Sequence, residues 1–209
     1  MVHVKQEDWN RKHAEAGLLF GAEPNRFLVA EVEGLAPGRA LDLACGAGRN
    51  AVWLAQRGWA VTGVDFSDVA LANARRLAAD RGVEVEWVLA DLREWSPAGE
   101  TFDLVAVLYL QLPAEERRGV LGRAAHAVAP GGTLLVVGHD LQNLNGGYGG
   151  PKDPAVLFTA EDVAAELTGL QVEKAERVLR PVETEEGEAQ AIDALVRARR
   201  AQEGPRRVS

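Results

Sequence analysis

The amino-acid sequence predicts an α/β fold: a doubly wound, mostly parallel sheet of seven strands with an antiparallel last strand. Short apolar runs alternate with helix-like segments along most of the 209 residues, as they do in successive strand–helix–strand units. A glycine turn at residues 46–48 joins the first strand to a helix. Two strand-like stretches near the C-terminus are separated only by a short acidic turn, so they can pair only as antiparallel neighbours.

The length and composition indicate one domain that works in a reducing compartment. A formal net charge of −8 argues against nucleic acid as the main partner. The one cysteine, Cys45, excludes an internal disulfide and suits a small apolar filler of a tight turn. Residues 1–10 are polar, and no apolar run approaches the roughly 18 residues of a membrane span. We therefore expect a cytoplasmic protein with no signal peptide and no membrane partner.

Two helices are expected before the first strand. Residues 5–16 have a helical pattern, and a second helix begins near Pro24 and ends near Gly34, since proline suits the first turn of a helix. We divide the single domain, residues 1–209, into four parts: a helical cap over 1–35, a cofactor-binding core over 38–140, a glycine-rich lid loop over 141–158, and a helix with the C-terminal strand pair over 159–200.

The unit around the glycine turn carries the main functional signal. Apolar residues flank Asp42 in a short buried strand, and the two glycines allow the backbone to approach a ligand closely. Residues 50–57 follow as a helix that stops at Gly58, and the free N–H groups at its start favour a negative group. The next strand ends at Asp65, 17 residues beyond Gly48, near the ribose-binding position expected about 20 residues on in a nucleotide-binding unit. The unit thus suits an adenosine-containing cofactor.

The later elements are predicted from caps, stops and periodicity. Ser67 suits the N-cap of a helix that stops at Gly82, and Thr159 begins a capping box. The elements expected after residue 66 are, in order, a helix to Arg81, strands over 83–90 and 102–108, a helix over 114–129 ended by Pro130-Gly131-Gly132, a strand over 133–138, a helix from Thr159 to Leu167, and strands over 170–179 and 189–198 around an acidic turn at 183–188.

The glycine turn by itself leaves the type of cofactor open. Residues 46–51 satisfy the loose G-x-G-x-x-G/A dinucleotide pattern, so an NAD-dependent oxidoreductase is one alternative. Asp42 weighs against that alternative, because it places a negative charge near a pyrophosphate. An amino-acid group with an ammonium suits this carboxylate better.

At this point the residues resemble the class I S-adenosylmethionine-dependent methyltransferases. The segment Asp42-Leu-Ala-Cys-Gly46-Ala-Gly48 matches the family's first motif, Asp/Glu-x-x-x-Gly-x-Gly. Asp65 matches the acidic residue that binds both ribose hydroxyls, and Phe66 matches the bulky neighbour beside the adenine. The resemblance covers about residues 20–140 and implies a Rossmann-like methyltransferase fold, with S-adenosyl-L-methionine as cofactor and S-adenosyl-L-homocysteine as product.

Within that family, the acceptor implied by the resemblance is a small molecule. The segment from Cys45 to Asn50, with Arg49, looks most like tellurite-resistance and thiopurine-type small-molecule methyltransferases. The Asn/Asp-Pro-Pro-aromatic motif of enzymes that methylate adenine or glutamine nitrogen does not follow the strand over 102–108. A non-catalytic module that binds an adenosyl ligand is a further alternative, and a homodimer is possible.

The resemblance also implies a set of cofactor-binding residues. Trp9 is expected to cap the cofactor and Arg26 to pair with its carboxylate; the alternatives are a docking anchor and a solvated charge. Asp91 is expected to accept a hydrogen bond from the adenine amino group, or else to serve as a loop carboxylate. The full expected set is Trp9, Arg26, Asp42, Ala44, Gly46, Gly48, Asn50, Asp65, Phe66, Ser67, Ala90, Asp91, Leu92 and Leu108.

Two residues are candidates for the acceptor chemistry. His139 follows the fifth expected strand, at the edge where an α/β fold binds its ligands, and Tyr109 follows the fourth at the same rim. A hydroxyl acceptor requires a base such as His139, whereas an acceptor that is already an anion requires none. A structural role for His139 is the alternative. The four histidines and one cysteine have no zinc-binding spacing, so we expect no metal.

Overall fold

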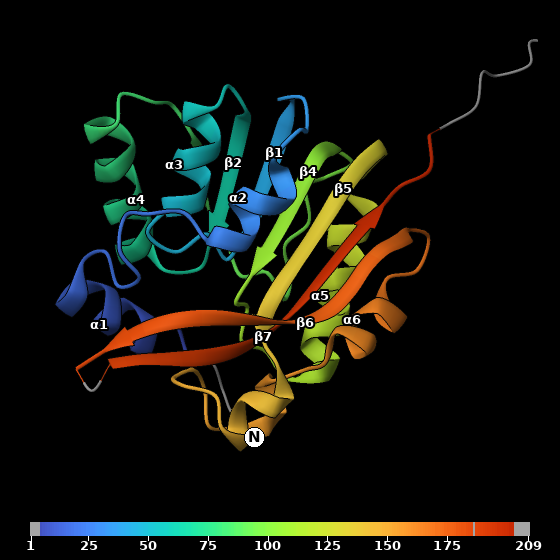
Figure 1. Cartoon of the computed structure of the whole chain (residues 1–209). Coiled ribbons are helices and arrows are strands. Elements are labelled where there is room, and N and C mark those ends of the chain that lie inside the picture. Colours follow the sequence, from blue (N-terminus) through green and yellow to red (C-terminus); the bar gives the residue numbers. More distant parts are fainter. Residues whose placement is uncertain (1–4, 186, 203–209) are drawn as a thin grey trace, which may run out of the picture.

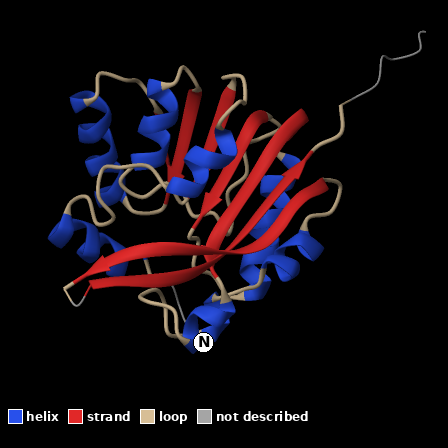
Figure 2. Ribbon diagram, viewed as in Figure 1, coloured by secondary structure: helices blue, strands red, loops and turns tan. Residues whose placement is uncertain are grey.

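The computed structural model describes residues 5–185 and 187–202, and the strands in this part form one twisted sheet with helices on both faces (Figures 1 and 2). The sheet has seven strands in the order β3-β2-β1-β4-β5-β7-β6. The strands are β1 Arg39–Leu43, β2 Ala60–Asp65, β3 Glu86–Leu89, β4 Phe102–Leu108, β5 Val128–His139, β6 Gln171–Thr184 and β7 Gly187–Arg199.

The helices follow the predicted order. They are α1 Gln6–Ala16, α2 Arg26–Val32, α3 Arg49–Gln56, α4 Asp68–Asp80, α5 Ala114–His126 and α6 Ala160–Glu166, with two short 3-10 helices, η1 Leu141–Asn145 and η2 Pro154–Val156. Among the described helices, none has the length and apolar character required to cross a membrane.

The sheet topology confirms the predicted fold class. β1 pairs in parallel with β2 and β4, and the parallel part continues to β3 on one side and β5 on the other. β7 runs antiparallel to both β5 and β6. The first crossovers place their strands on either side of β1, so the order reverses there and the carboxyl ends of β1 and β4 open a crevice for ligands.

Two apolar clusters bury both faces of the central strands. One joins the sheet to α5 and α6 and includes Val105, Leu121 and Val163. The other joins it to α2 and α3 and includes Leu28 and Leu54. Full burial of each such side chain contributes roughly 1.5–3 kcal/mol. These clusters explain why the central strands are almost continuously apolar, and they leave the ends of the strands as the place for polar chemistry.

The boundary between α5 and β5 differs from the prediction. The helix ends at His126, and Pro130-Gly131-Gly132 lies inside β5, which the sequence placed only at 133–138. The backbone N–H of Phe102 donates to the Ala127 carbonyl, and the β4–β5 register shifts between Phe102 and Leu104. A Cβ at Gly132 would lie 2.9 Å from the Phe102 carbonyl oxygen. Close backbone packing therefore accounts for this glycine.

Two further strand predictions were wrong in extent. The predicted acidic turn at 183–188 is largely strand, with Glu183 opposite Glu188 and Thr184 opposite Gly187. Two strands that extend into solvent tolerate charged side chains on their exposed positions, so charge did not mark the turn. β3 begins only at Glu86 because Val83 still donates to the Ala78 carbonyl at the end of α4.

The segment 141–158, predicted as a lid, is attached to the C-terminal strands at two points. Asn143 is buried; its Oδ1 accepts from the Ile192 N–H at 2.8 Å, and its Nδ2 donates to the Gly149 carbonyl at 3.0 Å. The Tyr148 N–H donates to the Gln190 carbonyl at 2.8 Å. These hydrogen bonds fix the position of the segment relative to β7. Whether it closes over a ligand stays a prediction, as does the four-part division of the domain.

Candidate functional site

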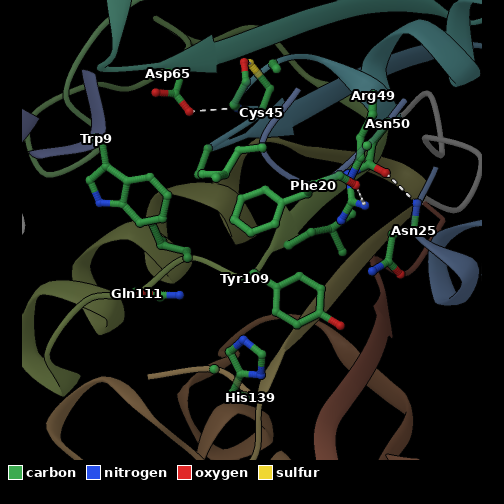
Figure 3. A pocket seen from close by; sticks show the side chains of 18 of the residues that line it. Trp9, Phe20, Asn25, Cys45, Arg49, Asn50, Asp65, Tyr109, Gln111 and His139 are labelled. Atoms are coloured by element: carbon green, nitrogen blue, oxygen red, sulfur yellow. Dashed lines mark hydrogen bonds between the residues drawn. The ribbon is translucent and has the colours of Figure 1, made fainter. Parts of the chain in front are cut away.

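The carboxyl ends of the parallel strands open into a cavity of about 600 Å³, which we call the site cavity (Figure 3). This volume lies within the range of small-molecule and cofactor sites. Its wall combines α1, the segment before α2, the glycine turn, the ends of β2, β4 and β5, residues 148–150, and residues 180–182 of β6. The cavity therefore draws on both ends of the chain as well as the core.

The glycine turn forms one side of the cavity and has no room for a side chain at Gly48. Gly48 has a φ of +78°, and a Cβ there would lie 2.6 Å from the Trp87 ring and 2.8 Å from the Ala74 Cβ. Gly46 has a φ of +53°, and its N–H donates to Oδ2 of Asp65 at 2.8 Å. One side of the turn is thus packed against β3 and α4, and residues 45–47 of the turn line the cavity.

Asp65 ends β2 and lines the cavity. Its Oδ1 accepts from the Ser67 N–H at 2.9 Å, in addition to the Gly46 bond to Oδ2. Burial raises the pKa of Asp65, although the two backbone N–H donors act in the opposite direction. A carboxylate oxygen has two lone pairs, so each oxygen can still accept from a ligand hydroxyl.

Asp42 lies in β1 beneath the glycine turn and is only 1% exposed. Both carboxylate oxygens are buried, and neither has a hydrogen-bond partner among the described residues. Burial, followed by the charge of Asp65, raises the pKa of Asp42 to about 7. Such a carboxylate is destabilising unless a cation approaches it. A ligand ammonium above the turn would supply that cation.

Arg49, at the first position of α3, provides an unpaired positive charge in the cavity. Its Nη1 donates to the Phe20 carbonyl at 2.8 Å, and its guanidinium lies 5.7 Å from the centre of the Phe20 ring (Figure 3). Within the described residues it makes no ion pair with a carboxylate. Arg26 also lines the cavity, from the exposed start of α2. Two guanidinium groups are thus available to a ligand carboxylate.

The N-terminal helix is held against α4 beside the cavity. Asn10 donates to Asp68 at 2.8 Å and accepts from the Ser67 hydroxyl at 2.6 Å. Trp9 and the buried His13 of this helix both line the cavity. Burial lowers the pKa of His13, whose ring lies next to the glycine turn. Trp9 thus lines the cavity, and its role as a cap over the cofactor stays a prediction.

Asp91 lines the cavity but already has a partner. Its oxygens accept from the Arg93 side chain at distances of 2.5–3.0 Å, and these bonds are the main reason that its pKa is lowered. Leu92 and Phe66 line the same region. The expected contact of Asp91 with an adenine amino group must therefore use the remaining lone pairs of this carboxylate.

Tyr109, His139 and Arg180 form the far end of the cavity, which we call the acceptor end. The Tyr109 and His139 rings are 4.9 Å apart between centroids (Figure 3). The Tyr109 hydroxyl donates to Oδ2 of Asp193 at 2.7 Å, and burial and this carboxylate raise the Tyr109 pKa. Tyr109 has a φ of +57°, an uncommon conformation for a residue with a side chain. It is therefore held in place as a neutral donor.

The structure brings most of the predicted site residues together. Those that line the cavity are Trp9, Arg26, Ala44, Gly46, Asn50, Asp65, Phe66, Asp91, Leu92, Leu108, Tyr109 and His139. Asp42, Gly48, Ser67 and Ala90 are not among the residues that line the cavity. Ser67 has the predicted capping role, because its hydroxyl accepts from the Ala70 N–H at 3.0 Å.

Several cavity residues were not predicted as functional. They are His13, Phe20, Asn25, Gln111, Tyr148, Arg180 and, as a ligand partner, Arg49. For Arg49, its position directly after the second glycine was an available signal. For Arg180 the sequence offered none, because it lies in a charged edge strand far from the core motifs. In residues 5–185 and 187–202, no group of three or more His, Cys, Asp or Glu side chains is arranged to hold a metal.

Comparison with known proteins identifies the core. Residues 40–132 match the model of a family described as a methyltransferase domain. A demethylmenaquinone methyltransferase of Thermus thermophilus is 38% identical over 104 residues, which cover 49% of this chain and 47% of that protein. A ribosomal RNA small subunit methyltransferase C of Alcanivorax borkumensis is 33% identical over 106 residues, covering 48% of this chain and 32% of that protein. The chain thus spans about half or less of the length of these relatives.

Solved structures extend the likeness to nearly the whole fold. The N-methyltransferase NodS from Bradyrhizobium japonicum, in complex with S-adenosyl-L-homocysteine, superposes with a TM-score of 0.71 at 21% identity, covering 93% of this chain and 97% of that one. TehB from Haemophilus influenzae gives a TM-score of 0.70 at 18% identity, covering 94% of this chain and 67% of that one. At these identities the likeness concerns the fold alone.

Proposed function

We propose that this chain, which belongs to the class I S-adenosylmethionine-dependent methyltransferases, transfers the methyl group of that cofactor to a small-molecule acceptor in the site cavity. One observation carries the proposal. A single cavity extends from Asp65 and the glycine turn to Tyr109 and His139. It therefore offers a place for an adenosyl ligand and, next to it, a place for a second molecule.

The residues present fit the cofactor. The buried carboxylate of Asp42 does not line the cavity, but its negative charge next to the glycine turn favours an ammonium group on the cavity side of the turn. Residues 45–47 of the turn line the cavity. Asp65 would accept from the ribose hydroxyls, Phe66 and Trp9 would cover the adenine and the cofactor, and Arg49 or Arg26 would hold the carboxylate. When bound, S-adenosylmethionine supplies a methyl group on a positively charged sulfur, which is already a good leaving group. The chain's own residues then have to align the acceptor and exclude water.

A small molecule suits this cavity better than a nucleic acid does. The chain has a formal net charge of −8, which opposes binding to a phosphate backbone. Phe20, Tyr148 and Val182 line the cavity from three different segments. One relative is named as a ribosomal RNA methyltransferase, so an RNA acceptor is the alternative that an experiment has to address.

Binding and turnover test the proposal in two steps. Calorimetry should show binding of S-adenosyl-L-homocysteine and much weaker or no binding of NADH. A transfer assay with methyl-labelled cofactor should then label at least one member of a panel of thiols, phenols, amines, selenite and tellurite, but not ribosomal RNA. Tighter binding of NADH would overturn the cofactor. Labelled RNA with no labelled small molecule would overturn the acceptor class, and binding with no transfer would favour an adenosyl-ligand sensor.

A further inference from the structure

Asp193 is buried next to the acceptor end and contacts side chains that line it. It belongs to β7 directly opposite His139 of β5 in the antiparallel register, and its side chain is 0% exposed. Its Oδ2 accepts from the Tyr109 hydroxyl at 2.7 Å and from Nε of Arg180 at 2.8 Å. Two strands, β5 and β6, and the residue after β4 thus direct polar side chains at one carboxylate of β7.

The imidazole of His139 is the third group at this carboxylate. Its Nδ1 lies 3.2 Å from Oδ1 of Asp193, within ion-pair distance, and within the described residues neither atom has a partner that meets hydrogen-bond geometry. Gly150 packs against the ring, since a Cβ there would lie 2.9 Å from Nδ1. Contacts in ligand-free sites are often longer than in the complex. The carboxylate oxygen beside Nδ1 can only accept a hydrogen bond, so it favours the imidazole tautomer with the proton on Nδ1. In that tautomer the lone pair of Nε2 is available to the cavity.

The same contacts exclude Tyr109 as the base. Its hydroxyl proton is donated to Asp193, and Nε of Arg180 lies 3.1 Å from its oxygen. Burial opposes the charged form of Asp193, but the contacts with His139, Arg180 and Tyr109 outweigh it and hold its pKa below the ordinary value. Asp193 is therefore a carboxylate, and His139 is the side chain at this end with a free basic nitrogen.

We propose that Asp193 is a positioning residue that holds His139 as a general base, and that the acceptor is a hydroxyl group. This inference rests on the proposed methyl transfer. The acceptor oxygen forms a bond to the methyl carbon as the bond between that carbon and the cofactor's sulfur breaks. The sulfur keeps the electron pair, and the hydroxyl proton passes to Nε2 of His139.

A general base held in place at the acceptor end favours some classes of methyl acceptor over others. A thiol ionises near pH 8.5 and an oxyanion is already charged, so neither depends strongly on a base. A neutral amine attacks with its own lone pair. A phenolic hydroxyl ionises only near pH 10, so it gains most from proton removal during transfer. A histidine with a carboxylate behind it matches that requirement.

The tautomer of His139 can be measured without any acceptor. Long-range proton–nitrogen NMR of the ligand-free full chain, with the His139 signal assigned by its loss in H139N, should show a proton on Nδ1 and none on Nε2. In Asp193→Asn the preference should be lost, because the amide can also donate to Nδ1. Asp140→Asn is a matched control: it removes a neighbouring buried carboxylate that is paired with Arg177, and it should leave the His139 signals unchanged. An Nε2-protonated ring in the unmodified chain would overturn the inference, even if Asp193→Asn fails to fold.

The acceptor class is tested with labelled cofactor and matched probes. Catechol and phenol should be methylated faster than thiophenol, aniline or selenite. H139N should lower the rate on the phenols by about 10²–10⁴-fold and remove the fall in rate at acidic pH, while calorimetric binding of S-adenosyl-L-homocysteine stays unchanged. D193N should act in the same direction. Transfer only to thiols or selenite, or a phenol rate that does not depend on His139, would overturn the inference. No binding of S-adenosyl-L-homocysteine would instead overturn the proposed function.

Discussion

At the scale of single residues, Asp42 is in conflict with its surroundings. A buried carboxylate with a pKa near 7 and no partner lowers the stability of the ligand-free protein. The folded chain holds its proton more tightly than the unfolded chain does. Between about pH 4 and pH 7 the folded state therefore binds more protons, and stability falls as the pH rises through this window. Above pH 7 the full cost of the charged form is present.

This conflict predicts opposite effects of one substitution on stability and on binding. Asp42→Asn should raise the free energy of unfolding at pH 8 and flatten its dependence on pH between 5 and 8, as measured by chemical denaturation. The same variant should bind S-adenosyl-L-homocysteine more weakly, because its ammonium loses a counter-charge. Asp140→Asn is the contrast, since it removes a carboxylate paired with Arg177 at 3.1 Å and should destabilise the protein. A less stable Asp42→Asn at pH 8 would contradict the argument.

At the scale of the elements, features set by neighbouring residues, such as helix caps, were predicted correctly. Strand boundaries that depend on pairing with a distant strand were not. Ser67 and Thr159 cap α4 and α6 as predicted, because a cap needs only its own first turn. The start of β5 depends on pairing with Phe102, and the length of the β6–β7 ribbon depends on pairing between distant charged residues. Neither partner can be read from the segment itself, so both boundaries were misplaced.

Two glycine-to-alanine variants can separate the cost of crowding around a new Cβ at Gly48 from the cost of a positive φ. Gly48→Ala should destabilise the fold by about 1–3 kcal/mol, because the new Cβ would meet Trp87 and Ala74 as well as require a positive φ. Gly82→Ala is the control, since Gly82 has a φ of +65° but nothing within 4 Å of a Cβ. It should cost only about 1 kcal/mol. Equal losses in urea denaturation would show that crowding at Gly48 is unimportant.

The segment 141–158 is predicted to act as a cover over the acceptor end. Tyr148, Gly149 and Gly150 line the cavity there, and Asn143 fixes the segment to β7. Hydrogen exchange over residues 146–150 should slow when S-adenosyl-L-homocysteine and catechol are both present, because a closed cover protects its own backbone. Exchange over residues 68–80 reports the general slowing that binding causes by stabilising the domain, and exchange over residues 146–150 should slow by more. Equal exchange at 146–150 with and without ligands would reduce the segment to a connection.

At the scale of the whole molecule, the residues around Asp65 could be predicted as neighbours from the sequence, whereas those around His139 could be predicted only in part. The first group is built from one continuous motif, Asp42 to Asp65, whose spacing is visible in the sequence. The second group combines Tyr109, His139, Arg180 and Asp193, which only the strand order β4-β5-β7-β6 brings together. His139 and Tyr109 could be placed at this end because one ends and the other follows a strand of the parallel core. Asp193 and Arg180 lie within a ribbon whose register no local pattern encodes.

Because the cavity wall includes residues from both ends of the chain, ligand binding should stabilise the entire domain. A ligand that binds only the folded state adds about 2.7 kcal/mol at a concentration of 100 times Kd. For a domain of this size that corresponds to a rise in Tm of roughly 5–11 °C. Thermal unfolding with S-adenosyl-L-homocysteine should show this rise as a single transition, and NADH should leave Tm unchanged. A split transition would mean that the two ends do not unfold together.

Because Asp193 lies opposite His139, the proposed chemistry depends on the register of β7 against β5. Side chains alternate between the two faces of a strand, so a slip of β7 by one residue would turn Asp193 to the opposite face and leave His139 without its partner. Residues added at the tip of the ribbon, around Glu185, would lengthen it without moving this pair. A single residue inserted between Asp193 and Arg199 would break it. The β6–β7 ribbon can thus be lengthened at its tip, but not between Asp193 and Arg199, if the contact between His139 and Asp193 is to be kept.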